Sequence, residues 1–378
     1  MSQELAKQRA EARFSVGEKQ EHSLIQAISA MVIRDRLVAP KSMQFGLELV
    51  ERPHDPNSDA VVDTVGIGLR YGDSTELVKI HRHALGQLAG KVEFPITYLN
   101  KLSTGEQWRW ELLVHNLNTL FHSSQFGRED NPRFLHRLVG NELRAFLSRR
   151  FNRHLASLPL LRAFVESVQA CQGRPIEANI TDLRWSLKCY LPMVFEAFPG
   201  QYICVGVTQS HSDFGAGKHV ISQSIWDPMR DTRTVLEGVS KVHLGSIIED
   251  SDIELSEGTA VAEVEAQARA AQDAVNTYLG EESIEKALKA VRVAHEEKIP
   301  WSDLKSALSR VLYDKELASV ETLLNSPDIV DLPPVGKTAS GDPLPTKWWA
   351  STMLSKLANS QDDERKMELQ SLAGKWLG

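Results

Sequence analysis

The sequence has few cysteines, no long apolar run and no excess of positive charge. Its three cysteines, Cys171, Cys189 and Cys204, show no Cys-x-x-Cys spacing, which argues against a disulfide framework or a zinc knuckle. No run of about 18 apolar residues occurs, so we expect no transmembrane helix. The polar stretch 1–22 lacks the apolar segment of a signal peptide. These features predict a cytoplasmic protein without a membrane partner.

The formal net charge of −7 excludes a uniformly basic coat for nucleic acid. It does not exclude a local basic patch, because a net charge says nothing about its distribution. A hydrophobic content of 42% in 378 residues is enough for a sizeable core in one large or two ordinary domains.

Hydrophobic spacing indicates a mixed α+β body followed by a mainly helical region. Helix-like and strand-like segments mix up to about residue 245, with hairpin signals at 43–70 and 133–148. A Pro/Gly-rich stretch then separates two helical regions. We predict four parts: an α+β body with an antiparallel sheet at 1–245, a helical region at 246–326, a linker at 327–346 and a helical tail at 347–378.

The decapeptide SHSDFGAGKH (210–219) resembles two nucleotide-handling motifs and fits neither. A phosphate-binding loop needs a glycine at the position of Ser212 and a hydroxyl residue at the position of His219. A kinase Asp-Phe-Gly triplet needs a His-Arg-Asp loop upstream, which this sequence lacks. Strand-like runs on both sides favour a hairpin turn in which Gly215 and Gly217 adopt positive φ.

No set of side chains has the spacing of a catalytic or metal-binding site. His81 and His83 would share one face of a strand, but the sequence identifies no third ligand. Cys204 lies in an apolar, strand-like run and is expected to be a small buried side chain. A nuclease would need clustered carboxylates for metal ions. The nearest candidates are Asp213, Asp227 and Asp231, whose positions are typical of turns. We predict no enzyme activity, no cofactor and no metal.

The most concentrated charge is a basic segment at 128–154. Arginine suits phosphate because its planar fork donates two parallel hydrogen bonds. If the segment forms a hairpin, Arg133 and Arg137 project from one face and Phe134 from the other. Two interpretations stay open: a phosphate-binding face, or a solvated face that pairs with the acidic stretch 249–265. The aromatic residues of the segment are Phe134, Phe146 and Phe151.

Five segments of the chain occur in an informative order: FPITYLNKLS, HNLNTLF, RFLHRLVGNELRAFLSRRFNRHL, GVTQSHSDFGAGKHVI and KVHLGSI. Together they resemble the phage/plasmid-like proteins, a family of unknown function found in bacteriophages and plasmids. The family's Arg-Ala-x-Leu-Ser step matches 144–148, its Ser-x-x-Gly turn matches 212–215 and its His-x-Gly step matches 243–245. The resemblance covers about 94–280. The sequence Leu-Glu-Gly at 236–238 stands where the family has a Cys-x-Asn-Gly step, so no role for that cysteine carries over.

The resemblance implies a protein of phage or plasmid DNA metabolism. Some members of the family are similar to single-strand annealing recombinases of the RecT/Redβ type. That similarity implies an α+β fold with a curved antiparallel sheet and packed helices, followed by a mainly helical C-terminal region. It agrees with a basic segment and with the lack of a catalytic constellation.

We therefore predict a non-catalytic protein that binds and anneals single-stranded DNA in recombination, in the host cytoplasm if a phage encodes it. Oligomerisation would multiply weak phosphate contacts along a strand, so a homo-oligomer is expected. The alternative is a phage structural or host-interaction protein that binds no nucleic acid. The expected DNA-binding residues are Arg133, Arg137, Arg144, Arg149, Arg150, Arg153 and Lys218.

The tail at 347–378 contains Trp348, Trp349 and Trp376. These side chains could dock a protein partner or pack onto the body. The sequence favours neither role over the other.

Overall fold

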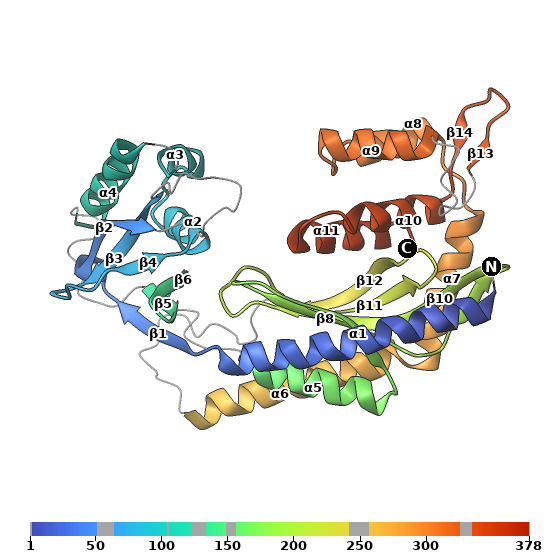
Figure 1. Cartoon of the computed structure of the whole chain (residues 1–378), viewed down its shortest axis with the longest axis horizontal. Helices are drawn as coiled ribbons and strands as arrows, with labels where there is room; N and C mark the ends of the chain where they lie inside the picture. The colour runs from blue at the N-terminus through green and yellow to red at the C-terminus, as the bar shows by residue number, and fades with distance from the viewer. Residues whose placement is uncertain are drawn as a thin grey trace.

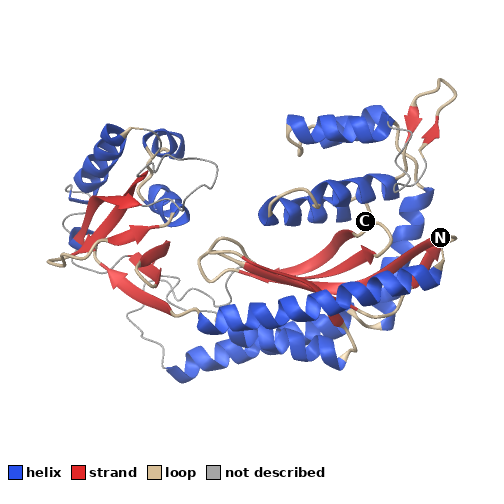
Figure 2. Ribbon diagram, in the orientation of Figure 1, coloured by secondary structure: helices blue, strands red, loops and turns tan. Residues whose placement is uncertain are grey.

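The structure, a computed structural model, describes residues 2–50, 64–103, 106–122, 134–148, 156–241, 257–325 and 335–377. These residues form two six-stranded sheets, one two-stranded hairpin and helices that cover the sheets. Figures 1 and 2 show two lobes, one around each large sheet. The α+β class and the helical C-terminal region are confirmed. The predicted body at 1–245 contains two separate sheets, whereas the sequence predicted a single antiparallel sheet.

The N-terminal lobe is built on the sheet with the strand order β1-β5-β6-β4-β3-β2. Its described pairs are antiparallel except β4 with β6. The predicted hairpin at 43–70 is the β2–β3 pair, in which the buried residues Phe45 and Leu69 face each other. Helices α2 to α4 share a core with the sheet, because Leu88 and Leu117 pack with Phe146. The bounds are β1 (Ile33–Val38), β2 (Met43–Val50), β3 (Thr64–Tyr71), β4 (Val78–Ile80), α2 (Arg82–Lys91), α3 (Ile96–Leu102), α4 (Gln107–His122), β5 (Phe134–Val139) and β6 (Glu142–Ser148).

The second lobe contains the sheet with the strand order β12-β11-β10-β8-β7, and β9 pairs with β10. Successive side chains of each strand point to opposite sides, so the sheet has two different faces. Leu187 and Val207 point to one face, where they share a core with helices α1, α5, α6 and α7. Thr208 and Ser222 point to the other face, which carries polar side chains. The bounds are α1 (Gln3–Ala30), α5 (Ser157–Ala170), β7 (Arg174–Ile180), β8 (Trp185–Tyr190), β9 (Phe195–Phe198), β10 (Gln201–His211), β11 (His219–Asp227), β12 (Thr232–Lys241), α6 (Glu257–Tyr278) and α7 (Glu281–Glu296).

The C-terminal tail packs onto the second lobe. A Cβ at Gly374 of α11 would collide with the carbonyl of Val235 in β12, so the helix lies directly on that strand. Trp348 and Trp349 of α10 are 2% and 1% exposed, and Trp376 is half-buried against the same helices. The tail tryptophans therefore pack onto the rest of the protein, which is one of the two roles that the sequence left open. The bounds are α8 (Trp301–Leu308), α9 (Asp314–Asn325), α10 (Lys347–Ala358) and α11 (Asp363–Gly374).

The predicted linker is only partly described. Residues 327–334 lie outside the described residues. Within the rest, β13 (Gly336–Lys337) and β14 (Pro343–Leu344) form the two-stranded hairpin seen at the right of Figure 1.

The turn between β10 and β11 connects the two lobes. Phe214, at its centre, is 2% exposed and packs against Leu135 and Leu147 of the first sheet. The Phe214 carbonyl accepts hydrogen bonds from His83 Nε2 (3.1 Å) and Gln87 Nε2 (3.0 Å) of α2. The predicted hairpin turn is confirmed. The same turn also packs the second lobe against the N-terminal lobe.

Local hydrogen bonds and one glycine set the shape of this turn. The hydroxyl of Ser212 accepts the backbone N–H of Phe214 at 3.1 Å, so a serine caps the turn. Gly215 has a φ of +73°, as predicted. Gly217 was expected to share this conformation but has no positive φ. It lies instead beside Arg184, whose Nη2 would be 3.5 Å from a Cβ at that position.

Replacing Phe214 with alanine should loosen the contact between the lobes. Loss of a buried phenylalanine costs about 3–5 kcal/mol, and here most of that loss falls on the lobe–lobe contact. We expect a larger radius of gyration in solution scattering, together with cleavage of the chain between the lobes in limited proteolysis.

The matched control is Phe121→Ala, which removes a buried ring from the core of the N-terminal lobe alone. It should lower the unfolding temperature while leaving the scattering profile of the folded protein unchanged. A Phe214→Ala protein with the original radius of gyration would contradict the assigned role of the turn.

Candidate functional site

Only three of the seven basic residues predicted to bind DNA lie in the described parts of the chain. Arg133, Arg149, Arg150 and Arg153 lie outside the described residues, as does the His-x-Gly step at 243–245. The three that can be placed are Arg137 on β5, Arg144 on β6 and Lys218 before β11.

Arg137 is enclosed between the lobes. Its residue is 2% exposed, because β5 lies between β1 and β6 and the β10–β11 turn covers its face. The guanidinium donates to Asp35 Oδ1 at 3.0 Å and to the Asp213 carbonyl at 2.7 Å. In this arrangement its hydrogen bonds hold the lobes together, and a phosphate has no access to it.

Arg144 is partly buried beside the same turn. It donates to Glu142 Oε2 and to the Asp182 carbonyl, both at 2.9 Å, and its guanidinium lies 5.8 Å from the ring centre of Phe214. These partners of Arg137 and Arg144 come from several separate segments, and none of them is in the described part of 249–265.

The aromatic residues of the basic segment belong to the core where they are described. Phe134 and Phe146 are 5% and 0% exposed and pack edge to face with Phe121 of α4. Phe151 lies outside the described residues. The two phenylalanines that can be placed are therefore not available to stack on bases.

Lys218 is exposed and lies at the end of the turn next to Gly217. Because Gly217 also lies beside Arg184, Arg184 and Lys218 both stand near the point where the turn enters the second sheet. Arg184 stands immediately before β8 and was not identified from the sequence. It marks one end of a cavity.

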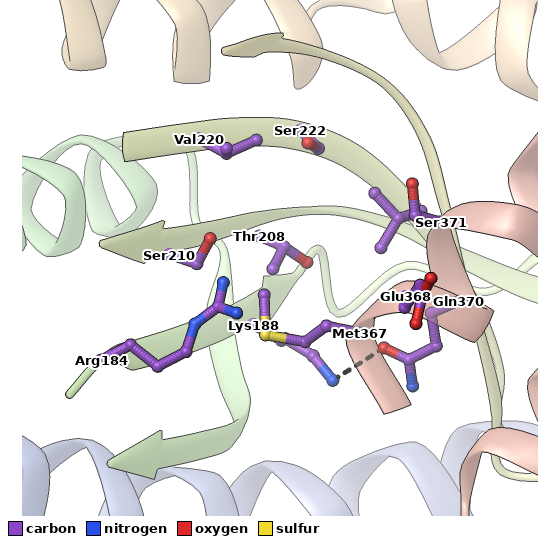
Figure 3. A pocket seen from close by; sticks show the side chains of 11 residues that line it. Arg184, Lys188, Thr208, Ser210, Val220, Ser222, Met367, Glu368, Gln370 and Ser371 are labelled. Atoms are coloured by element: carbon purple, nitrogen blue, oxygen red, sulfur yellow. Dashed lines mark hydrogen bonds between the residues drawn. The ribbon is translucent and has the colours of Figure 1, made fainter. Parts of the chain in front are cut away.

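This cavity, which we call the polar groove, has a volume of about 450 Å³ and lies on the face of the second sheet opposite α5 and α6. Strands β8, β10 and β11 form its floor, and α11 borders it. Figure 3 shows Arg184 at one end and the residues of α11 at the other. The lining includes Arg184, Lys188, Thr208, Ser210, Val220, Ser222, Val235, Met367, Glu368, Gln370 and Ser371.

The polar floor follows from the alternation of three short sequences. In WSLKCY, the residues Trp185, Leu187 and Cys189 enter the helix-covered core, so Lys188 faces the groove. The runs VTQSH and VISQSIW repeat this pattern with Thr208 on β10 and with a serine on β11. Period-two alternation of apolar residues with hydroxyl groups was the signal available in the sequence. This alternation carries little charge, so the charge density of the sequence pointed to 128–154 instead.

A carboxylate with several cationic neighbours lies beneath the inner end of the groove. Glu177 of β7 is 3% exposed, and its oxygens lie 3.0 Å from Lys188 Nζ, 3.0 Å from Arg233 Nη1 and 2.8 Å from Lys366 Nζ. Arg13 of α1 contacts it at 3.8 Å. Burial alone would raise the pKa of Glu177, but Lys188, Arg233 and Lys366 outweigh burial and lower it below its ordinary value.

Lys188 links this cluster to the groove. Burial lowers the pKa of Lys188 to about 8, whereas Glu177 opposes the change and favours the charged form. Its ammonium also donates to Gln370 Oε1 of α11 at 3.0 Å, the dashed contact in Figure 3. Four cationic side chains surround Glu177. Among the described residues, Asp231 is the only other acid that pairs with any of them, at 2.8 Å from Arg233. The cations around Glu177 therefore outnumber the carboxylates.

The groove offers more donors than acceptors to a ligand. Gln370 Nε2 and Arg184 Nε are buried and have no hydrogen-bond partner in the described residues. Glu368, the one carboxylate in the lining, pairs with Arg365 at 2.6 Å. A site with this balance suits an anionic ligand that is rich in acceptor oxygens.

The residues considered for metal or enzyme chemistry have structural partners. His81 caps α2 by accepting the N–H of His83 at 3.1 Å. Asp227 accepts the N–H of Met229 at 2.8 Å, as a turn former does. Cys204 is fully buried, as predicted, and burial raises its pKa to about 12. Across the described ranges, no group of three or more His, Cys, Asp or Glu side chains could hold a metal ion.

Comparison with known proteins finds no matching family model, no matching curated protein and no matching solved structure. The resemblance to phage/plasmid-like proteins therefore stays a prediction. No helix in the described ranges is long and apolar enough to cross a bilayer.

Replacing Glu177 with glutamine should destabilise the fold, because several cations would stay buried without their carboxylate. Loss of one partner of a buried ion pair costs about 3–5 kcal/mol. The pKa of Glu177 is lowered in the folded state, so its contribution is present above the ordinary value of 4.5 and is lost as the pH falls below it. Denaturant unfolding should show the full difference at pH 7 and a smaller one at pH 3.

The control is Glu166→Gln, a change at an exposed glutamate of α5. It should alter the free energy of unfolding by less than about 0.5 kcal/mol. Equal stability of the Glu177→Gln protein and the original protein at pH 7 would show that Glu177 does not hold the cluster together.

Proposed function

We propose that the protein binds single-stranded DNA without catalysing a reaction, and that it anneals strands in the recombination of a phage or plasmid. The polar groove supports this proposal most strongly. It combines cationic side chains with hydroxyl and amide donors on an open sheet face, in a chain whose net charge is −7. Of the basic segment at 128–154, from which the prediction started, only Arg144 lies near this region among the described residues, beside Asp182 and the β10–β11 turn.

The charge in the groove favours a phosphodiester chain as the ligand. Arg184, immediately before β8, and Lys188 on β8 are four residues apart with Ser186 between them, so the two cations share one face at a spacing of about 13 Å. Cations and hydroxyl groups bind phosphate oxygens, whereas the lining contains no aromatic side chain for stacking on bases. Binding through the backbone is independent of sequence and leaves the base edges free to pair, which annealing requires.

The size of the groove favours one strand over a duplex. A volume of about 450 Å³ is in the range of small-molecule sites, which enclose their ligand. A flexible single strand can enter such a space, whereas a base-paired helix cannot. Each protein would then hold only a short piece of strand, so we expect a homo-oligomer that adds the contacts of neighbouring copies.

Arg184→Ala tests the proposal in the intact chain. Because charge-assisted hydrogen bonds are worth about 1.5–3 kcal/mol, the affinity for single-stranded DNA should fall at least about tenfold at low salt. The slope of log K against log salt should decrease by about 0.7, the value for one phosphate contact with a single strand. Fluorescence anisotropy with a labelled oligonucleotide across a salt series measures both quantities.

The matched control is Arg162→Ala, because Arg162 is an exposed arginine of α5 on the opposite side of the sheet. It should leave affinity and salt slope unchanged, and both variants should keep the original melting temperature. If the original protein binds no single-stranded oligonucleotide at low salt, the proposed function is wrong and a protein-interaction role takes its place.

A further inference from the structure

We propose that the closed end of the polar groove binds the terminal phosphate of a DNA strand, so that the protein engages strand ends. This inference rests on the proposed function, since it names the part of the strand that the same groove recognises. The groove has two unlike ends, and only one of them is open along the direction of β8.

The open end lies at the β10–β11 turn, and α11 closes the other end. Figure 3 shows the floor strands running from Arg184 toward α11, whose residues Met367, Gln370 and Ser371 line the cavity. The helix is fixed in place, because Lys366 contacts Glu177 at 2.8 Å and Gly374 lies against β12. A strand laid along β8 would therefore meet α11 and stop.

The donors at the closed end are oriented for an anion. Lys188 Nζ can only donate, so the Gln370 atom 3.0 Å from it is the amide oxygen. That contact fixes the orientation of the amide and leaves Nε2 as a buried donor without a partner in the described residues. Gln370 is 0% exposed, and an unpaired donor at that depth is costly unless a ligand accepts from it. The hydroxyl groups of Thr208, Ser222 and Ser371 line the same space.

A terminal phosphate meets these donors better than an internal one. A phosphomonoester carries a charge of about −1.5 to −2 at pH 7 and three strong acceptor oxygens. An internal phosphodiester carries one negative charge and has two free oxygens. A donor-rich end of the groove with a lysine and a buried amide donor therefore discriminates between them through both charge and hydrogen bonding.

The test compares oligonucleotides of about 20 nucleotides that carry a 5′-phosphate, a 3′-phosphate or hydroxyl groups at both ends. A closed circular single strand, which has no end, completes the set. We expect one phosphorylated form to bind about tenfold more tightly than the hydroxyl-ended form, and the end that gives the effect identifies the polarity. Equal affinities for all linear forms would overturn the inference and leave single-strand binding intact.

Gln370→Glu is the variant that isolates the end site. The new side chain has the same shape and still accepts from Lys188, so the fold is preserved, but it replaces the free donor with a negatively charged acceptor. Because Gln370 lines the groove, the added negative charge should weaken the binding of every strand, but phosphorylated and hydroxyl-ended strands should now bind with equal affinity. The control Gln169→Glu adds the same charge at an exposed position of α5 and should keep the preference.

The outcomes separate the two proposals. A preference that survives Gln370→Glu places the phosphate elsewhere and overturns the assigned site. Absence of binding to every strand, including the circle, overturns the inference and the proposed function together.

Discussion

The ion cluster around Glu177 connects α11 with α1 and with three strands of the second sheet. Its members come from five elements: Arg13 from α1, Glu177 from β7, Lys188 from β8, Arg233 from β12 and Lys366 from α11. Burying these charges is expensive, because each loses its hydration. Their mutual attraction offsets that cost only while all partners are in place, so the cluster specifies where α11 lies on the sheet. The position of α11 in turn determines the size of the groove and closes one of its ends.

A buried ion cluster is a weak source of stability, since well-packed apolar residues of similar volume often stabilise a protein more. Its presence here is better explained by the ligand that we propose. One carboxylate surrounded by four cationic side chains leaves positive potential at the base of the groove, although the chain as a whole is acidic. The second lobe therefore has a helix-covered apolar face for stability and a polar face for binding.

Local patterns predicted local structure well. The β2–β3 and β5–β6 hairpins and the turn between β10 and β11 all follow from alternation and turn residues. Partners distant in the sequence could not be predicted in this way. Arg137 is 102 residues from Asp35, and Lys188 is 182 residues from Gln370. A short stretch of sequence therefore shows neither the enclosure of Arg137 nor the groove beside Lys188. The charge density of one segment made Arg137 a candidate for DNA binding. Arg184 and Lys188 occupy polar positions in an ordinary alternation of polar and apolar residues, which does not stand out in the sequence.

The central claim is that the polar face of the second sheet, under the edge of α11, is the surface that holds a DNA strand. Hydrogen–deuterium exchange of the full chain with and without a single-stranded oligonucleotide tests it most directly. The account predicts slower exchange in β8, in the β10–β11 turn and in α11, with no change in α5 or α6 on the opposite face. Protection confined to α5 and α6, or to the N-terminal lobe, would contradict it.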